Sequence, residues 1–149
     1  MSHPDIFRET VEECHAKLIE LGLLIEDILN ECMDLPPGFL KDYNDDRGFD
    51  HMTAKRYFPA TEEENVGISE HEDGNCITFI FQDGVGGLEV LTDGHWVPAE
   101  PASGSIIVNI GDVIKVKPER RISNSFHANT QWTRNKNLRL YIFFPKCRC

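Results

Sequence analysis

The sequence has no long apolar run and no recognisable export signal. A membrane-spanning helix needs roughly 20 consecutive apolar residues. None of the apolar runs in these 149 residues approaches that length. The N-terminus, MSHPDIFRETVEECHAK, contains no basic stretch followed by an apolar core, as a secretory signal would. We therefore expect a single soluble domain in the cytoplasm, with no membrane partner.

Positive charge is scarce. The chain has 15 Lys and Arg against 25 Asp and Glu, which gives a formal net charge of −10. A surface this acidic repels phosphate groups, so a nucleic acid partner is not expected. The clusters Glu62–Glu64 and Asp45–Asp46 are typical of solvated loops.

The cysteines are not expected to form a disulfide framework. Their number is odd, and no export signal accompanies them. Cys14 and Cys32 lie on the apolar face of a predicted helix, where a free thiol acts as a small hydrophobic side chain. The five are Cys14, Cys32, Cys76, Cys147 and Cys149.

Residues 1–37 have the periodicity of one long helix. Apolar residues recur at alternating spacings of four and three, which predicts an apolar stripe. Pro36-Pro37-Gly38 would end the helix. Such a stripe also fits a coiled-coil seam; additional leucines widen it here and favour packing against a sheet. The stripe comprises Phe7, Val11, Cys14, Leu18, Leu21, Ile25, Ile28 and Cys32.

From residue 52 onward, short β-like segments are separated by turn signals. This spacing predicts an antiparallel sandwich or barrel, because no helical crossovers separate the segments. Asp93-Gly94 suits a tight hairpin turn. We expect a mostly β protein in which a helical segment, 1–51, packs against a β core, 52–149. The expected strands are 52–58, 76–82, 88–91, 95–98, 105–110, 112–117, 121–126 and 138–144.

The segment ISEHEDGNCITFIFQDGVGG, residues 68–87, contains a candidate metal-binding pair. If this segment is extended, His71 and Asp73 share one face and Glu72 lies on the other. One imidazole and one carboxylate can bind a metal ion from one side. A His-x-Asp pair is by itself a weak signal, and more often belongs to an ordinary surface.

His127 is the candidate third ligand. It follows the late segment SNSF, and rolled antiparallel strands can bring residues about fifty positions apart onto facing sheets. Two histidines and one carboxylate leave open coordination positions, an arrangement that suits non-haem Fe(II) and oxygen chemistry.

The surrounding sequence resembles a known family. The series "VGGLEVL…DGHWVP…VNIGD" is similar to that of the plant-type Fe(II)- and 2-oxoglutarate-dependent dioxygenases, over about residues 52 to 144. This resemblance implies a double-stranded β-helix, or jelly roll. It also implies that His71, Asp73 and His127 are the iron ligands.

The resemblance further implies a co-substrate site. The family uses an Arg-x-Ser to bind the far carboxylate of 2-oxoglutarate, and Arg139-Leu140-Tyr141 stands there in this sequence. Arg139 suits a carboxylate because its planar fork makes two parallel hydrogen bonds. A family tyrosine before a proline has Phe58 in its place, with Tyr57 beside it. Tyr57 and Tyr141 are therefore the candidate hydroxyl donors, although strand alternation would turn Tyr57 to the other face from Phe58.

The function that this resemblance implies is oxidation, by hydroxylation or desaturation, of a small metabolite such as a flavonoid, an alkaloid or a gibberellin. Fe(II) and 2-oxoglutarate are the implied cofactor and co-substrate, with ascorbate in support. An alternative is a metal-binding protein without turnover that acts as an interaction module, and a jelly roll without metal is the simplest possibility. Family members carry longer segments at both ends, so we expect exposed sheet edges, and a dimer or a partner that covers them.

Overall fold

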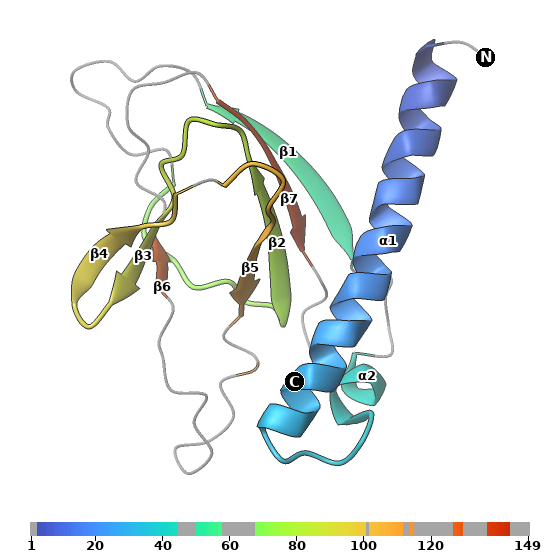
Figure 1. Ribbon diagram of the computed structural model, residues 1–149, viewed down its shortest axis with the longest axis vertical. Helices are drawn as coiled ribbons and strands as arrows, with labels where there is room; N and C mark the ends of the chain where they lie inside the picture. Colours follow the sequence, from blue (N-terminus) through green and yellow to red (C-terminus); the bar gives the residue numbers. More distant parts are fainter. Residues whose placement is uncertain are drawn as a thin grey trace. The chain divides into compact units, whose positions relative to one another are not determined.

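The computed structural model describes residues 3–44, 50–57, 68–100, 102–111, 114, 127–129 and 137–143. The chain divides into two compact units, one formed by residues up to Asp45 and the other from Asp46 onward. The first is helical and the second consists of β-strands (Figure 1).

The helical unit contains α1, His3–Cys32, and α2, Phe39–Tyr43. The predicted continuation of the first helix to residue 37 was wrong. A proline disfavours helical geometry in the residue before it, and Leu35 precedes Pro36. Neither helix in the described part of the chain is long and apolar enough to cross a membrane.

A Schellman motif ends α1. Asp34 adopts a left-handed conformation with φ 53°, a position that glycine usually occupies and that aspartate tolerates. Its N–H donates to the Glu31 carbonyl at 3.1 Å, and the Leu35 N–H donates to the Asn30 carbonyl at 2.9 Å. These bonds satisfy carbonyl groups that the helix end would otherwise leave unpaired.

The buried face of α1 differs from the predicted apolar stripe. Phe7 is 72% exposed and Ile28 is 50% exposed, although both belong to that stripe. Glu26 is fully buried instead, and its Oε1 accepts a 2.9 Å hydrogen bond from Asn44. An apolar pattern cannot locate a buried face that is partly polar. The buried residues are Leu18, Gly22, Glu26, Leu29 and Asn30.

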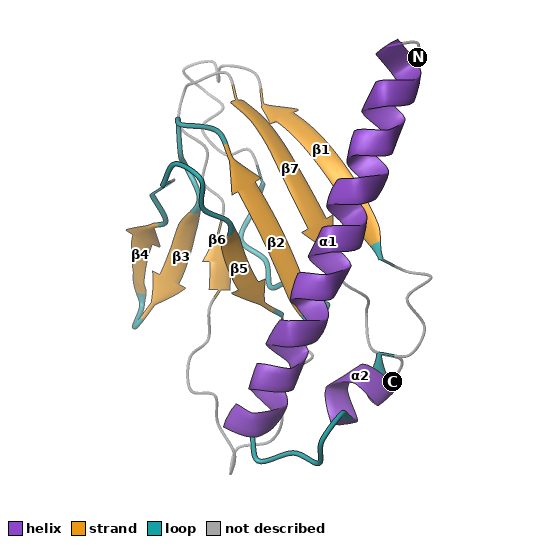
Figure 2. Ribbon diagram, turned by 45° about the vertical axis from the view of Figure 1, so that its right-hand side comes forward, coloured by secondary structure: helices purple, strands orange, loops and turns teal. Residues whose placement is uncertain are grey.

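The described residues of the strand unit form two antiparallel sheets. One has the order β1-β7-β2-β5 and the other β4-β3-β6 (Figure 2). Strands far apart in sequence are therefore neighbours, since β7 lies between β1 and β2. The strands are β1 His51–Tyr57, β2 Ile77–Gln82, β3 Glu89–Thr92, β4 His95–Pro98, β5 Ile107–Ile110, β6 His127–Asn129 and β7 Asn137–Phe143.

Most of the predicted strands are confirmed, with ends displaced by one or two residues. The predicted segments 112–117 and 121–126 lie outside the described residues except for Ile114, which is not in a strand. The turn between β3 and β4 is also confirmed: Asp93 and Gly94 have φ values of 51° and 76°. Two consecutive positive φ values are typical of a type I′ hairpin turn.

β2 supplies the centre of the β core. Ile77 and Phe79 have no exposed surface, and Ile80 packs with Leu88 on the alternate side. A strand buried on both faces is expected to be continuously apolar rather than alternating. The candidate metal-binding pair, His71 and Asp73, precedes this buried strand in the sequence.

Candidate metal centre

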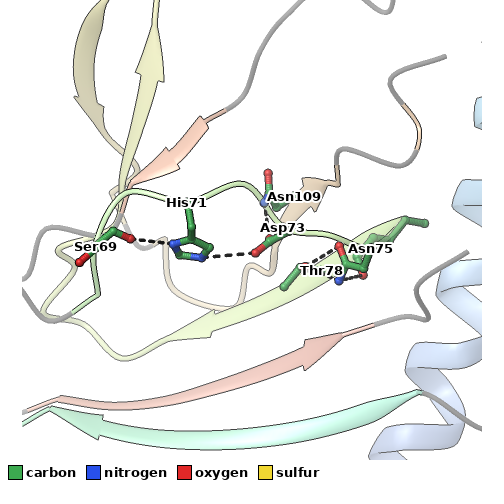
Figure 3. A network of polar contacts seen from close by, with 7 residues as sticks. Ser69, His71, Asp73, Asn75, Thr78 and Asn109 are labelled. Atoms are coloured by element: carbon green, nitrogen blue, oxygen red, sulfur yellow. Dashed lines mark hydrogen bonds and ion pairs between the residues drawn. The ribbon is translucent and has the colours of Figure 1, made fainter. Parts of the chain in front are cut away.

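His71 and Asp73 lie in a loop that leads into β2, and not in a strand. The predicted extended geometry was therefore wrong at this point, because bends at residues 74–76 separate the pair from the ladder. The two side chains nevertheless face one another, with His71 Nε2 3.5 Å from Asp73 Oδ1 (Figure 3). The loop therefore brings the His71 and Asp73 side chains together, as strand alternation was expected to do.

Hydrogen bonding determines which nitrogen of His71 can bind a metal. His71 Nδ1 lies 2.8 Å from the Ser69 carbonyl oxygen. A carbonyl only accepts, so Nδ1 carries the hydrogen, and in the neutral ring Nε2 presents a lone pair. A hydrogen bond from the ring nitrogen that does not bind the metal is typical of metal-binding histidines, because it fixes the ring's tautomer and orientation.

The lone pair at Nε2 faces a carboxylate. Two groups with lone pairs repel unless a cation lies between them, either a proton on the imidazole or a metal ion. Two ligand atoms bound at right angles to one ion at about 2.1 Å lie about 3 Å apart. The observed 3.5 Å is close to that spacing, so the donor pair fits a metal.

Asp73 is held by neighbouring polar groups. Burial acts to raise the pKa of Asp73, but hydrogen bonds with His71, Asn109 and Thr78 together lower it. The Asn109 amide donates to Asp73 Oδ2, which leaves Oδ1 facing His71. Asn75 Nδ2 donates to Thr78 Oγ1 at 2.9 Å, and the one hydroxyl proton of Thr78 is shared between Asn75 Oδ1, at 3.3 Å, and Asp73. The carboxylate is therefore ionised and fixed in orientation.

His127 lies in the sheet that does not contain β2. It begins β6 and pairs with Leu91 of β3. Its side chain lies outside the described part of the structure. Among the side chains that are described, no group of three His, Cys, Asp or Glu residues converges on a possible ion. His127 stays a predicted ligand.

The candidate co-substrate residues belong to neighbouring strands of the other sheet. In β7, Arg139 pairs with Gln82 of β2 and Tyr141 pairs with Ile80. In β1, Tyr57 pairs with Asn137, two residues before Arg139. Directly paired residues and alternate residues of a strand share a face. The backbone register thus places Tyr57 and Arg139 at alternate positions of paired strands, and the orientation of the Tyr57 side chain stays a prediction.

Three further residues of the site were not identified from the sequence. Asn109 and Thr78 hold Asp73, and Lys55 pairs with Arg139 across β1 and β7. Asn109 belongs to the segment VNIGD, which could have indicated it. No local pattern indicates Thr78 or Lys55, because their roles depend on which strands are neighbours.

A comparison with family models matches residues 49–147 to the 2OG-Fe(II) oxygenase superfamily. The chain belongs to this superfamily. The matched segment includes His71, Asp73, His127 and Arg139, and the family's name gives the metal and the co-substrate that its members use.

Curated relatives and solved structures agree with this assignment. The chain is 31% identical over 126 residues, 83% of its length, to 1-aminocyclopropane-1-carboxylate oxidase homolog 5 of Arabidopsis thaliana, and covers 31% of that protein. It is 29% identical to Protein DOWNY MILDEW RESISTANCE 6 of the same plant, over 99% of this chain and 44% of that protein. The chain thus spans less than half the length of these relatives.

The fold is similar to that of JOX2, whose crystal structure is a complex with 2OG, Fe and JA. The two share a TM-score of 0.80 at 24% identity, over 98% of this chain and 44% of that chain. At this level of identity the likeness establishes the fold alone.

Proposed function

We propose that this chain forms the Fe(II)- and 2-oxoglutarate-binding part of an oxygenase that hydroxylates or desaturates a small organic metabolite. The observation that carries the proposal is the His71–Asp73 pair. Its Nε2 and Oδ1 atoms face one another at 3.5 Å, while the second nitrogen and the second oxygen are engaged elsewhere.

The proposed metal ligands are His71, Asp73 and His127. A ligand set of two histidine nitrogens and one carboxylate leaves open coordination positions for a co-substrate and oxygen. Bound Fe(II) would supply the oxygen chemistry, and the protein would supply orientation. The positions of these residues before β2 and at the start of β6 support a jelly roll in which two sheets contribute to one site.

The proposed co-substrate residues are Arg139, Tyr141 and Tyr57. All three belong to the paired strands β1 and β7. An arginine there would bind the far carboxylate of 2-oxoglutarate through parallel hydrogen bonds, and the two tyrosines would offer hydroxyl donors. We propose that the helical residues 1–51 support this core.

The first test measures metal binding and co-substrate turnover on the same protein. Mn(II) binding is measured by calorimetry, and succinate released from 2-oxoglutarate is measured with Fe(II), ascorbate and oxygen. We expect one strongly bound ion for each chain, and more succinate than in a metal-free sample. Metal binding without succinate would favour the alternative of a binding module without turnover.

Asp73→Ala and Glu72→Ala form a matched pair of variants. Asp73 faces His71 and its side chain is only 7% exposed, whereas Glu72 is exposed. We expect Asp73→Ala to lower Mn(II) affinity by more than the roughly 10- to 100-fold that loss of an outer hydrogen-bond partner costs. Glu72→Ala should change it little. Equal losses in the two variants would contradict the proposed site.

A further inference from the structure

Asn75 is a buried amide beside the candidate metal centre. It is 6% exposed, and Thr78 of β2 is 1% exposed. Buried polar groups are normally hydrogen-bonded, because leaving one unpaired costs stability. Asn75 Nδ2 donates to Thr78 Oγ1 at 2.9 Å (Figure 3) and to the Ile77 carbonyl at 3.3 Å. The amide therefore binds to the strand that follows it in the sequence.

The direction of the Asn75 amide is fixed by its surroundings. A carbonyl oxygen only accepts, so the amide atom beside the Ile77 carbonyl must be the nitrogen. The amide oxygen lies against Gly111, where an added Cβ would be 2.5 Å from Oδ1. Asn75 thus presents an N–H group to Thr78 Oγ1.

This N–H group limits what the Thr78 hydroxyl can do. Oγ1 accepts from Asn75, and its single proton has two possible acceptors, Asn75 Oδ1 at 3.3 Å and Asp73. A distance of 3.3 Å is long for a hydroxyl donor, which usually lies within about 3.0 Å of its acceptor. An ionised carboxylate is also the stronger acceptor. The proton is therefore directed chiefly to Asp73, and this hydrogen bond helps to lower the pKa of Asp73.

Thr78 and Asn109 hold Asp73 together. They pair directly across β2 and β5, and Asn109 donates to Asp73 Oδ2. A carboxylate held by two donors rotates less readily than one held by a single donor. We propose that Asn75 is a positioning residue, which directs the Thr78 hydroxyl to Asp73. The carboxylate is thereby kept turned toward His71. This inference rests on the proposed function and adds a residue that acts on metal affinity without touching the ion.

The test is a double-mutant cycle on Mn(II) affinity, measured by calorimetry with the whole chain. Thr78→Val removes the hydroxyl and keeps the shape of the side chain. We expect it to lower Mn(II) affinity by about 10- to 100-fold, as loss of an outer partner of a metal ligand does. Asn75→Ala should lower it by about tenfold. Added to Thr78→Val, Asn75→Ala should lower it no further, because the hydroxyl through which it acts is already absent.

Thr78→Ser and Thr92→Val are the matched controls. Thr78→Ser loses a buried methyl group but keeps the hydroxyl. It should lower the free energy of unfolding in urea and still retain most of the Mn(II) affinity. Thr92→Val makes the same replacement at an exposed position of β3 and should bind Mn(II) like the wild type. A merely structural role would instead make Mn(II) affinity follow the stability of each variant.

Different results overturn different parts of the proposal. If the wild type binds Mn(II) and either Thr78→Val or Asn75→Ala binds it equally well, the inference is wrong and the proposed metal site stands. Equal losses from Asn75→Ala with and without Thr78→Val would also overturn it, as would a Thr78→Ser protein that loses as much affinity as Thr78→Val. A wild type that binds no Mn(II) would overturn the proposed function together with the inference.

Discussion

At the scale of single residues, the environment of His71 favours a positive charge beside Asp73. The Ser69 carbonyl fixes the ring, and the Asp73 carboxylate faces Nε2. A proton and a metal ion compete for the same place, because each can neutralise this pair. The hydrogen bond with Asp73 is the main reason that the pKa of His71 is raised above 6.5, although burial opposes it.

Metal affinity should therefore rise with pH over the range in which His71 loses its proton. In the metal-free protein, the raised pKa of His71 makes the stability of the fold decrease as pH rises. The His71–Asp73 ion pair stabilises the fold below the unfolded-state pKa of the histidine, and this contribution is lost as pH rises through the folded-state value. Calorimetric titration with Mn(II) from about pH 5 to about pH 8 measures the first effect, and thermal unfolding without metal measures the second. A flat Mn(II) affinity over this range would contradict the role of His71.

Asn109 orients the carboxylate and is expected to act through it. Asn109→Ala removes the donor to Asp73 Oδ2, so the carboxylate can rotate away from His71. We expect Mn(II) affinity to fall by about 10- to 100-fold, as for other outer partners of metal ligands. Asn109→Asp should reduce binding of the ion by misorienting Asp73 through like-charge repulsion. Unchanged affinity in the alanine variant would mean that Thr78 alone is sufficient to hold Asp73.

At the scale of elements, the loop before β2 and the end of β5 are held in close contact. The Gly111 N–H donates to the Cys76 carbonyl at 2.9 Å. A Cβ at Gly111 would lie 1.8 Å from the Asn75 carbonyl oxygen, far closer than atoms can approach. Glycine at this position therefore allows β5 to bring Asn109 to Asp73.

Gly111→Ala should lower the free energy of unfolding by about 1–3 kcal/mol, the usual cost of overpacking, because one backbone segment must move. Gly74→Ala is the control, since a Cβ there meets nothing within 4 Å. Urea denaturation monitors both variants, and Mn(II) titration shows whether the displaced segment also weakens the metal site. A Gly111→Ala protein as stable as Gly74→Ala would contradict the observed contact.

At the scale of the whole molecule, apolar side chains are exposed on strands that end the described sheets. Val97 of β4 is 49% exposed and Val108 of β5 is 39% exposed, and each strand is terminal in its sheet order among the described residues. Exposed apolar strand edges favour association. The helix α1 also exposes an apolar residue, Leu24, at 56%.

We therefore expect this chain to self-associate at high concentration. Replacing Val97 and Val108 together by lysine should shift the sedimentation profile toward the monomer, because a charged edge resists pairing. Leu24→Lys tests the other possible interface. If only that variant dissociates the protein, association occurs through α1, and a wild type that remains monomeric would contradict the prediction.

The sequence by itself determined the kinds of elements and the first two members of the site. Apolar spacing in a helix and alternation in a strand depend on neighbouring residues, so α1, most strands and the Asp93-Gly94 turn were predictable. His71 and Asp73 were also predictable, since two residues so close in sequence remain close in a loop as they would in a strand. The reason given for their proximity was nevertheless wrong.

Only the tertiary structure decided how distant segments meet. The pairing of β7 with both β1 and β2 places Lys55 opposite Arg139 and Tyr57 opposite Asn137 in the register. The contact of β5 with the loop before β2 brings Asn109 to Asp73. The burial of Glu26 depends on Asn44, which lies beyond the end of α1. These contacts join residues 18 to 84 positions apart, and no local periodicity encodes which of several similar segments will become neighbours.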